Sequence, residues 1–185
     1  MIIYYTDNFA GGREESHRLL GKALAAYTGD EQRAKALTGA LKKGEHGKPF
    51  IEGFDCFSIS HTGSIWAVLI AESECGLDVQ TGRKCDIKAI ADRWFAPDDA
   101  LSITLAETDQ SDAFFRIWTR REALVKALGG TVYDTGIPPV SGEYVRIDGD
   151  LYVIRDIQIP GMPDIYAAVC IYNRESISEP DFIRL

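Results

Sequence analysis

The sequence has few of the features that would place it in a membrane, outside the cell or on nucleic acid. Its 185 residues contain no apolar run near the ~18 residues that a membrane-spanning helix needs. The opening MIIYYTDNFA lacks the basic segment and long apolar stretch of a secretory signal. A net charge of −8 disfavours phosphate-backbone binding, which needs clustered positive charge. We therefore expect a soluble cytoplasmic protein without a membrane or nucleic-acid partner.

Cysteine is also used sparingly, and its spacing excludes the common metal and disulfide patterns. The chain has no C-x-x-C pair and no histidine at finger-like spacing from a cysteine. We interpret all four cysteines as reduced structural thiols: Cys56, Cys75, Cys85 and Cys170. With 45% hydrophobic residues, the chain is long enough to bury a core without such staples.

The pattern of apolar residues and turn signals predicts an α+β fold made of two α/β halves. In the first half we expect a strand at 1–6, helices at 13–27 and 30–41, a Gly- and Pro-containing loop at 42–50, and strands at 57–60 and 64–72. In the second half we expect a strand at 75–80, helices at 86–95, 97–107 and 111–128, and strands at 143–148, 151–159 and 165–172. A break near residue 73 then divides the chain into residues 1–73 and 74–185.

The long helix at 111–128 carries the first candidate site. Glu122 and Lys126 are four positions apart, on one face and at the edge of an apolar stripe. They form either a surface ion pair worth ~0.3–0.5 kcal/mol or part of a site. Arg121 projects into the middle of the stripe, so that either its stem reaches out of the core or its head group serves a site at the helix edge.

Polar residues on two further segments could complete such a site. Asp78 and Gln80 alternate with aliphatic residues and share one face of their strand, where they could face solvent or bind a hard cation such as Mg²⁺. Lys48 lies in a Gly/Pro loop, and Ser60 and His61 end the following strand. A lysine placed near such a turn could hold a phosphate, although a lone Ser-His pair is more often structural.

Together these segments resemble the 4′-phosphopantetheinyl transferase superfamily. Four motifs occur in the family's order: G-K-P at 47–49, F-x-I-S-H-x-G at 57–63, G-L-D-V-Q at 76–80 and F-x-x-W-T-x-R-E-A-x-x-K-x-x-G at 115–129. The similarity extends to SHRLLG at 16–21 and IADRWFAPDD at 90–99, and so covers about residues 13–130. The chain departs from many relatives at Gln80, where they have Glu, and at Arg121, where they have Lys.

The position of the motifs indicates a subclass. The strand with Asp78 begins about 75 residues into the chain, behind a half that carries G-K-P and S-H. This arrangement is similar to the longer, surfactin-type enzymes rather than to the short type that assembles as trimers. The resemblance implies two similar halves packed as an intramolecular pseudodimer, acting as a monomer with one site at their junction.

The resemblance also implies a reaction and a role for each residue. Coenzyme A is the co-substrate, an apo acyl or peptidyl carrier protein is the acceptor, and 3′,5′-ADP is released. Mg²⁺ is expected on Asp78 and Glu122, with Gln80 as a third ligand. Glu122 is the candidate base for the carrier serine, and Lys126 is expected to stabilise charge on the transferred phosphate.

The remaining roles concern coenzyme A, and two alternative functions stay open. Arg18, Lys48, Pro49, Ser60, His61 and Lys126 are expected to bind the co-substrate, with Arg18 at its 3′-phosphate and His61 also counted with the catalytic groups. A non-catalytic homologue would bind coenzyme A without transfer. An Mg²⁺-dependent phosphohydrolase would release phosphopantetheine to water without a carrier. No motif assigns a role to the last 55 or so residues.

Overall fold

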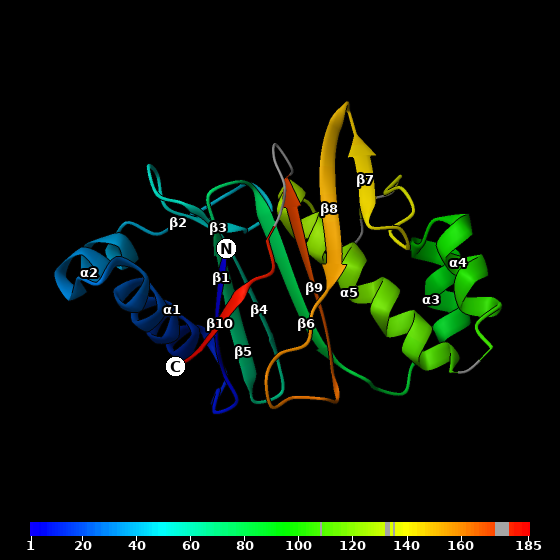
Figure 1. Ribbon diagram of the computed structural model, residues 1–185, viewed down its shortest axis with the longest axis horizontal. Helices are drawn as coiled ribbons and strands as arrows, with labels where there is room; N and C mark the ends of the chain where they lie inside the picture. The colour runs from blue at the N-terminus through cyan, green and yellow to red at the C-terminus, as the bar shows by residue number, and fades with distance from the viewer. Residues whose placement is uncertain (108, 132–133, 135, 173–177) are drawn as a thin grey trace.

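The computed structural model of the chain describes residues 1–107, 109–131, 134, 136–172 and 178–185. In this part of the chain, two four-stranded sheets stand between helices that cover their outer faces (Figure 1). Helices α1 and α2 cover one sheet and α5 covers the other, with α3 and α4 packed beyond α5 (Figure 1). None of the described helices is long and apolar enough to cross a membrane.

The N-terminal sheet has the strand order β10-β1-β5-β4. Its elements are β1 (Ile2–Thr6), β4 (Cys56–Thr62), β5 (Ile65–Ala71) and β10 (Asp181–Arg184), with α1 (Arg13–Thr28) and α2 (Glu31–Gly39) outside it. β1 pairs antiparallel with β5 and parallel with β10. Helix α1 ends at Gly29, whose φ of 67° is left-handed and therefore suits glycine.

The C-terminal sheet has the strand order β6-β9-β8-β7, and all its pairings are antiparallel. Its strands are β6 (Cys75–Thr81), β7 (Tyr144–Ile147), β8 (Asp150–Asp156) and β9 (Ile165–Tyr172). Its helices are α3 (Ile87–Trp94), α4 (Pro97–Thr104) and α5 (Gln110–Leu128). The Asp109 side chain caps the start of α5, and Gly129 ends it with a left-handed φ of 71°.

Three apolar cores hold these layers together. One packs α1 and α2 on the outer face of the N-terminal sheet and includes Leu20, Leu24 and Trp66. A second lies between the sheets, where Ile3 and Leu69 meet residues such as Leu77. The third packs α5, α3 and α4 on the outer face of the C-terminal sheet. Burial of apolar surface on both faces of both sheets fixes which way each side chain of β4 and β6 points.

The predicted elements are largely confirmed, with four differences. The strand expected at 151–159 ends at Asp156. Residues 42–50, expected as a loop, contain a two-residue ladder of β2 (Lys42–Lys43) with β3 (Pro49–Phe50). The second and fourth predicted helices are shorter than expected, since α2 ends at Gly39 and α4 at Thr104. β10 was not predicted, and it returns from the end of the described chain to pair with β1. All four cysteines are free thiols.

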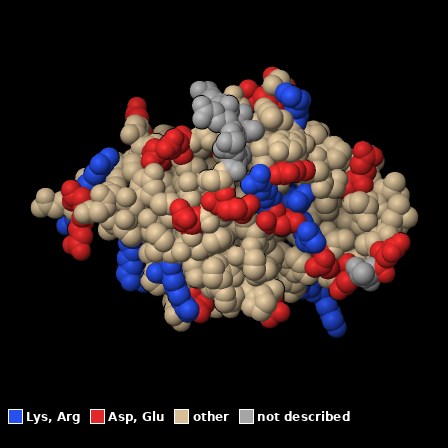
Figure 2. All heavy atoms as spheres, viewed as in Figure 1, with Lys and Arg blue, Asp and Glu red and all other residues tan. Residues whose placement is uncertain are grey.

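Charged side chains are spread over the surface rather than sorted by sign. On the face in Figure 2, acidic and basic side chains lie interspersed, and the described residues form no continuous basic area there. Several of these charges pair across elements; Arg116 and Arg120 of α5, for example, both contact Asp156 of β8.

Candidate active site

Strands β4 and β6 run beside each other where the two sheets meet, and the candidate site lies on this seam. Ser60 Oγ of β4 donates a hydrogen bond to Asp78 Oδ1 of β6 at 2.9 Å. Lys126 Nζ of α5 donates to the same carboxylate oxygen at 2.7 Å. The structure thus brings together three predicted site residues from three elements.

A glycine lets the helix come this close to the strand. Gly76, Asp78 and Gln80 share the face of β6 that α5 covers, whereas Leu77 and Val79 enter the core between the sheets. A Cβ at Gly76 would lie 1.8 Å from the carbonyl oxygen of Ala123 and so could not be accommodated. Because Gly76 has no side chain, α5 can pack close to β6 and therefore close to Asp78.

Lys126 is held by three acceptors rather than by its helix neighbour. Besides Asp78, its ammonium donates to Ser60 Oγ and to the backbone oxygen of Leu77, each at 3.0 Å. No salt bridge joins Lys126 to Glu122 among the described residues, so the surface ion pair considered from the sequence is not present. Lys126 instead links α5 to strands β4 and β6.

Glu122 is a buried carboxylate with a raised pKa. Its residue is 9% exposed, and the described residues provide no hydrogen bond to its carboxylate. Burial, and then the nearby Asp78 charge, raise the pKa of Glu122 to about 7, against the opposing influence of Lys126 and Arg121. Such a group exchanges protons readily near neutral pH, as a general base must.

Asp78 and Glu122 together fit a divalent cation that is completed by other ligands. Asp78 Oδ2 is buried and has no hydrogen-bond partner in the described residues. An orphaned carboxylate oxygen next to a second buried carboxylate is costly unless a cation or protons join them. Among the described residues, no group of three or more His, Cys, Asp or Glu side chains is placed to hold a metal ion by itself. A hard cation would therefore need oxygens from substrate and water, as Mg²⁺ commonly does.

Gln80 and His61 lie on the same seam but do not join the carboxylates. The Gln80 amide nitrogen donates to the backbone oxygen of Thr81 at 3.1 Å. His61 is exposed, and its ring centroid is 5.1 Å from that of Phe9. By strand alternation the exposed His61 ring points to the opposite face of β4 from Ser60, toward Phe9. Gln80 lies on the same face of β6 as Asp78.

The remaining predicted residues lie farther from the carboxylate pair. Lys48 Nζ donates to the backbone oxygens of Cys75 at 3.0 Å and Ala127 at 3.2 Å, so it joins the N-terminal half to the end of α5. Pro49 begins the short strand β3 next to it. Arg18 lies on the exposed side of α1 and pairs with Glu15 through two hydrogen bonds.

Two hydroxyl side chains beside Ser60 were missed by sequence reasoning. Ser58 Oγ accepts from the backbone N–H of Leu77 at 3.0 Å, and Thr62 Oγ1 accepts from that of Thr81 at 3.3 Å. Ser60 does the same for Val79 at 3.1 Å. The signal was present, because hydroxyl residues alternate at 58, 60 and 62 with period two.

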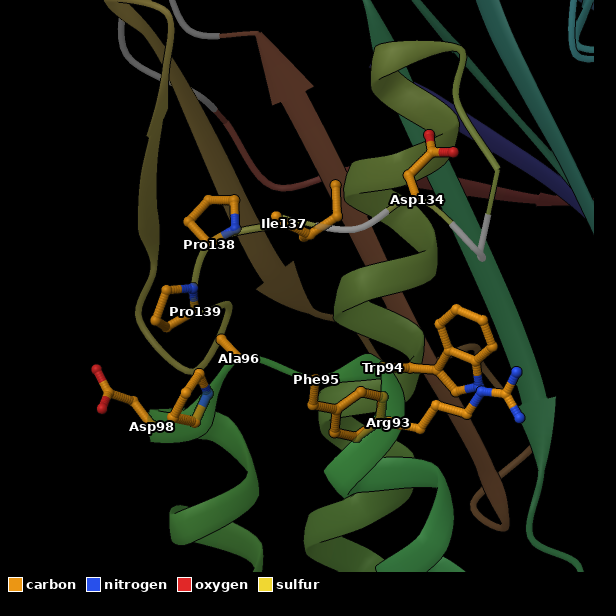
Figure 3. A pocket seen from close by; sticks show the side chains of 11 residues that line it. Arg93, Trp94, Phe95, Ala96, Asp98, Asp134, Ile137, Pro138 and Pro139 are labelled. Atoms are coloured by element: carbon orange, nitrogen blue, oxygen red, sulfur yellow. The ribbon is translucent and has the colours of Figure 1, made fainter.

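A pocket of about 510 Å³ lies beside the site, along α5 (Figure 3). It is bounded by residues 93–98 and by residues from the 134–139 segment, and none of Asp78, Glu122 and Lys126 lines it. Arg121 connects the two places, since its Nη2 donates to the backbone oxygen of Asp134 at 2.7 Å. Arg121, which was predicted to project into the apolar stripe, is thus buried, and its guanidinium bonds to the backbone of a residue that lines the pocket.

A second polar side chain, Asp99, supports the adjoining segment. It is 2% exposed and accepts hydrogen bonds from the backbone N–H groups of Val140 and Ser141. Arg120 donates to three carbonyl oxygens of the same segment, 140–142. The sequence assigned no role to either residue, because the partners are backbone groups that leave no residue pattern.

Comparison with known proteins agrees with this geometry. Residues 74–143, which contain Asp78, Glu122 and Lys126, match the 4′-phosphopantetheinyl transferase superfamily. The chain is 35% identical over 164 residues to the 4′-phosphopantetheinyl transferase AcpT of Escherichia coli O157:H7, covering 86% of this chain and 76% of that protein. It is 37% identical over 132 residues to AcpT of Salmonella typhimurium, covering 69% and 64% of the two chains.

A third relative matches over a smaller share of both chains. The 4′-phosphopantetheinyl transferase gsp of Aneurinibacillus migulanus is 32% identical over 94 residues, which are 50% of this chain and 39% of that protein. The chain therefore spans less than two thirds of the gsp and Salmonella proteins. The similarity to Escherichia coli AcpT nevertheless extends over most of both chains. This chain belongs to the 4′-phosphopantetheinyl transferase superfamily.

Proposed function

We propose that the protein transfers 4′-phosphopantetheine from coenzyme A to a serine of an apo carrier protein. The serine oxygen forms a bond to phosphorus, the phosphoanhydride P–O bond of coenzyme A breaks, and 3′,5′-ADP leaves. One observation carries the proposal: Asp78 has one oxygen held by Lys126 and the other unpartnered, beside the buried Glu122. This is the arrangement that a cation bound to a pyrophosphate requires.

The roles of these residues follow from their environment. Asp78 and Glu122 would hold Mg²⁺, with Gln80 on the same face of β6 as a candidate to bind it or its water. The cation would neutralise the charge that develops on the 5′-phosphate of the leaving 3′,5′-ADP. Glu122, directly or through a metal-bound water, would accept the proton of the attacking serine. Lys126 would hold Asp78 Oδ1 through a charge-assisted hydrogen bond. Its positive charge would also stabilise the negative charge of the transferred group.

Coenzyme A would lie across the seam between the halves. His61 is exposed next to Ser60 and is the candidate for its phosphates, and Arg18 on α1 is the candidate for the 3′-phosphate. Lys48, which precedes β3, reaches the backbone oxygens of Cys75 and Ala127, and Pro49 follows it as the first residue of β3. Arg18 can reorient toward the 3′-phosphate, because its ion pair with Glu15 is half-exposed and therefore weak.

The architecture suggests how the site is completed within one chain. Residues 1–73 contribute three strands to one sheet and residues 74–172 form the other, and each sheet has helices on its outer face, which supports the proposal of two similar halves packed as a pseudodimer. β10 of the second half adds a fourth strand to the first sheet. Because β4 of the first half contributes Ser60 to Asp78 of the second, we expect a cytoplasmic monomer that needs no second copy. Light scattering should give a mass near 20.5 kDa; a stable trimer would contradict the proposal.

The transfer reaction is tested by mass spectrometry of the acceptor. The protein is incubated with coenzyme A, Mg²⁺ and an apo acyl or apo peptidyl carrier, and the carrier should gain the mass of the phosphopantetheine arm. EDTA should abolish the gain, because two carboxylates alone cannot neutralise the pyrophosphate. Full activity in metal-free buffer would exclude the proposed role of Asp78 and Glu122. Release of phosphopantetheine to water at equal rates with and without a carrier would identify a phosphohydrolase instead.

One variant tests the base. Glu122→Gln should lower kcat by at least ~10²-fold, the usual contribution of a positioned base. Glu14→Gln, an exposed change in the first turn of α1, is the control and should leave kcat unchanged. Normal turnover of Glu122→Gln would remove Glu122 from the mechanism.

A further inference from the structure

We propose that Ser60 is a positioning residue for the cation site: its hydroxyl orients Asp78 so that Oδ2 is left free for the metal. This inference rests on the proposed function, because it assigns a role within the same site. It concerns a side chain that sequence motifs associate with coenzyme A. The structure instead surrounds its oxygen with protein groups.

The hydrogen-bonding capacity of the Ser60 hydroxyl is fully used. A hydroxyl donates one hydrogen bond and accepts two. Ser60 Oγ donates to Asp78 Oδ1 at 2.9 Å and accepts from Val79 N at 3.1 Å and Lys126 Nζ at 3.0 Å. Its residue is 5% exposed. No proton remains on this oxygen for a phosphate, so its influence on the reaction passes through Asp78 and Lys126.

The two contacts to Asp78 fall on the same carboxylate oxygen. Oδ1 receives hydrogen bonds from both Ser60 and Lys126, whereas Oδ2 receives none from the described residues. Two donors on one oxygen fix the rotation of the carboxylate, and so fix where the second oxygen lies. Loss of the hydroxyl would leave Oδ1 held by Lys126 alone, and the carboxylate could then turn.

The neighbouring hydroxyls separate this role from simple strand pairing. Ser58 accepts from a backbone N–H of β6 in the same way as Ser60, and it is 3% exposed. Its hydroxyl has no contact with Asp78 or Lys126 among the described residues. Ser58→Ala therefore removes the same kind of seam hydrogen bond from the same strand face, two residues away, and leaves the carboxylate clamp in place.

The test measures cation binding directly. Mn²⁺, which takes the carboxylate, water and phosphate ligands of Mg²⁺, is titrated into the protein with coenzyme A and no carrier, and free Mn²⁺ is read by electron paramagnetic resonance. Ser60→Ala should weaken Mn²⁺ binding by about 10-fold, the lower end of the effect of losing a group that orients a metal ligand. Ser58→Ala and Ser60→Thr, which keeps the hydroxyl, should stay within about 2-fold of wild type.

The outcomes separate this inference from the proposed function. If wild type binds no Mn²⁺ in the presence of coenzyme A, the proposed metal site itself is wrong. If wild type binds and Ser60→Ala and Ser58→Ala weaken binding equally, the positioning role is wrong and Ser60 only pairs the strands. If Ser60→Ala instead weakens coenzyme A binding in EDTA, Ser60 reads a phosphate, which also overturns the inference. Should Ser60→Ala fail to fold, Ser60→Cys replaces it; the weakly bonding thiol should also loosen Mn²⁺, and wild-type binding by Ser60→Cys would overturn the proposal.

Discussion

The helices that cover the two sheets bury different kinds of side chain. The buried residues of helix α1 are all apolar, namely Leu19, Leu20, Ala23 and Leu24, and none of its charged residues is buried. Helix α5 buries Thr119, Arg121 and Glu122 along with its apolar residues. Buried charges cost free energy unless they are paired, so a helix that contains them gives up stability.

We infer from this difference that α1 mainly stabilises the fold, whereas α5 carries residues of the proposed active site. The Arg18–Glu15 pair of α1 is solvated and could be lost at little cost. The Glu122 carboxylate of α5 has no hydrogen bond from the described residues, and its pKa is raised to about 7. The N-terminal half contributes hydroxyls from β4 to the seam, while both carboxylates and the ammonium come from the C-terminal half.

The largest expected effect comes from the closeness of α5 to its strand. Gly76→Ala places a Cβ 1.8 Å from Ala123 O and 2.6 Å from Ala127 N, which are backbone atoms of α5 that cannot move alone. We expect destabilisation of about 3 kcal/mol or more, the upper range for overpacking, with loss of transfer because Lys126 shifts from Asp78. Urea unfolding measures the first effect and the carrier assay the second.

Gly21 of α1 is the matched control. A Cβ there would lie 3.5 Å from Thr38 Oγ1, an ordinary contact. Gly21→Ala should therefore stabilise the protein by roughly 0.5–1 kcal/mol, because glycine in a helix interior is unfavourable. If both variants unfold at the same urea concentration as wild type, α5 does not pack more closely at Gly76 than α1 packs at Gly21.

The buried carboxylate of α5 should make stability depend on pH. The pKa of Glu122 is about 7 in the folded chain and 4.5 ordinarily, so the folded state binds the proton more tightly. Between these values the free energy of unfolding should fall as pH rises, by up to about 3 kcal/mol relative to Glu122→Gln. Urea unfolding of both proteins at pH 5 and pH 8 in EDTA measures this. Parallel pH dependences would show that Glu122 ionises normally.

An exposed arginine of α1 should affect substrate binding and not stability. Arg18→Ala is expected to raise KM for coenzyme A several-fold, roughly the contribution of one charge-assisted contact. With dephospho-coenzyme A, which lacks the 3′-phosphate, wild type and variant should converge. Arg33→Ala on α2 removes another exposed cation and should change neither KM. Equal losses on both substrates would show that Arg18 does not read the 3′-phosphate.

Lys48→Ala provides a second comparison on the same substrates. Its ammonium donates to Cys75 O and Ala127 O, so we expect lower stability in addition to the predicted rise in KM. An unchanged KM for both co-substrates would restrict Lys48 to joining the halves.

The smallest effect is expected at Gln80. Gln80→Glu should lower the Mg²⁺ concentration for half-maximal rate a few-fold, because a carboxylate binds the cation better than an amide. Gln80→Ala should change little, since water replaces a neutral ligand and the amide otherwise contacts Thr81 O. Mg²⁺ titrations at fixed coenzyme A compare the three proteins. Loss of activity in Gln80→Ala at every Mg²⁺ concentration would make Gln80 an essential direct participant.

Sequence periodicity predicted the elements and the shared face of Asp78 and Gln80, because alternation and helical spacing follow from burial. It also placed Glu122 and Lys126 on one side of α5. It did not predict that Lys126 would contact Asp78 instead of Glu122, since that depends on the height of the helix above Gly76. The contacts of Lys48 and Asp99 are to backbone atoms, which no residue pattern encodes. β10 was not predicted because its two apolar residues, Phe182 and Ile183, form too short a run to show an alternating pattern.

The pairing of β10 with β1 has a consequence for how the protein is made. Ile2 faces Asp181 and Tyr5 faces Arg184, so the parallel ladder joins the first strand of the described chain to its last. During synthesis β1 can pair with β5 long before β10 exists, and its other edge stays open until residues 181–184 have left the ribosome. An open strand edge is a template for pairing with other chains. A nascent chain stalled before residue 181 should therefore aggregate more readily than the finished protein.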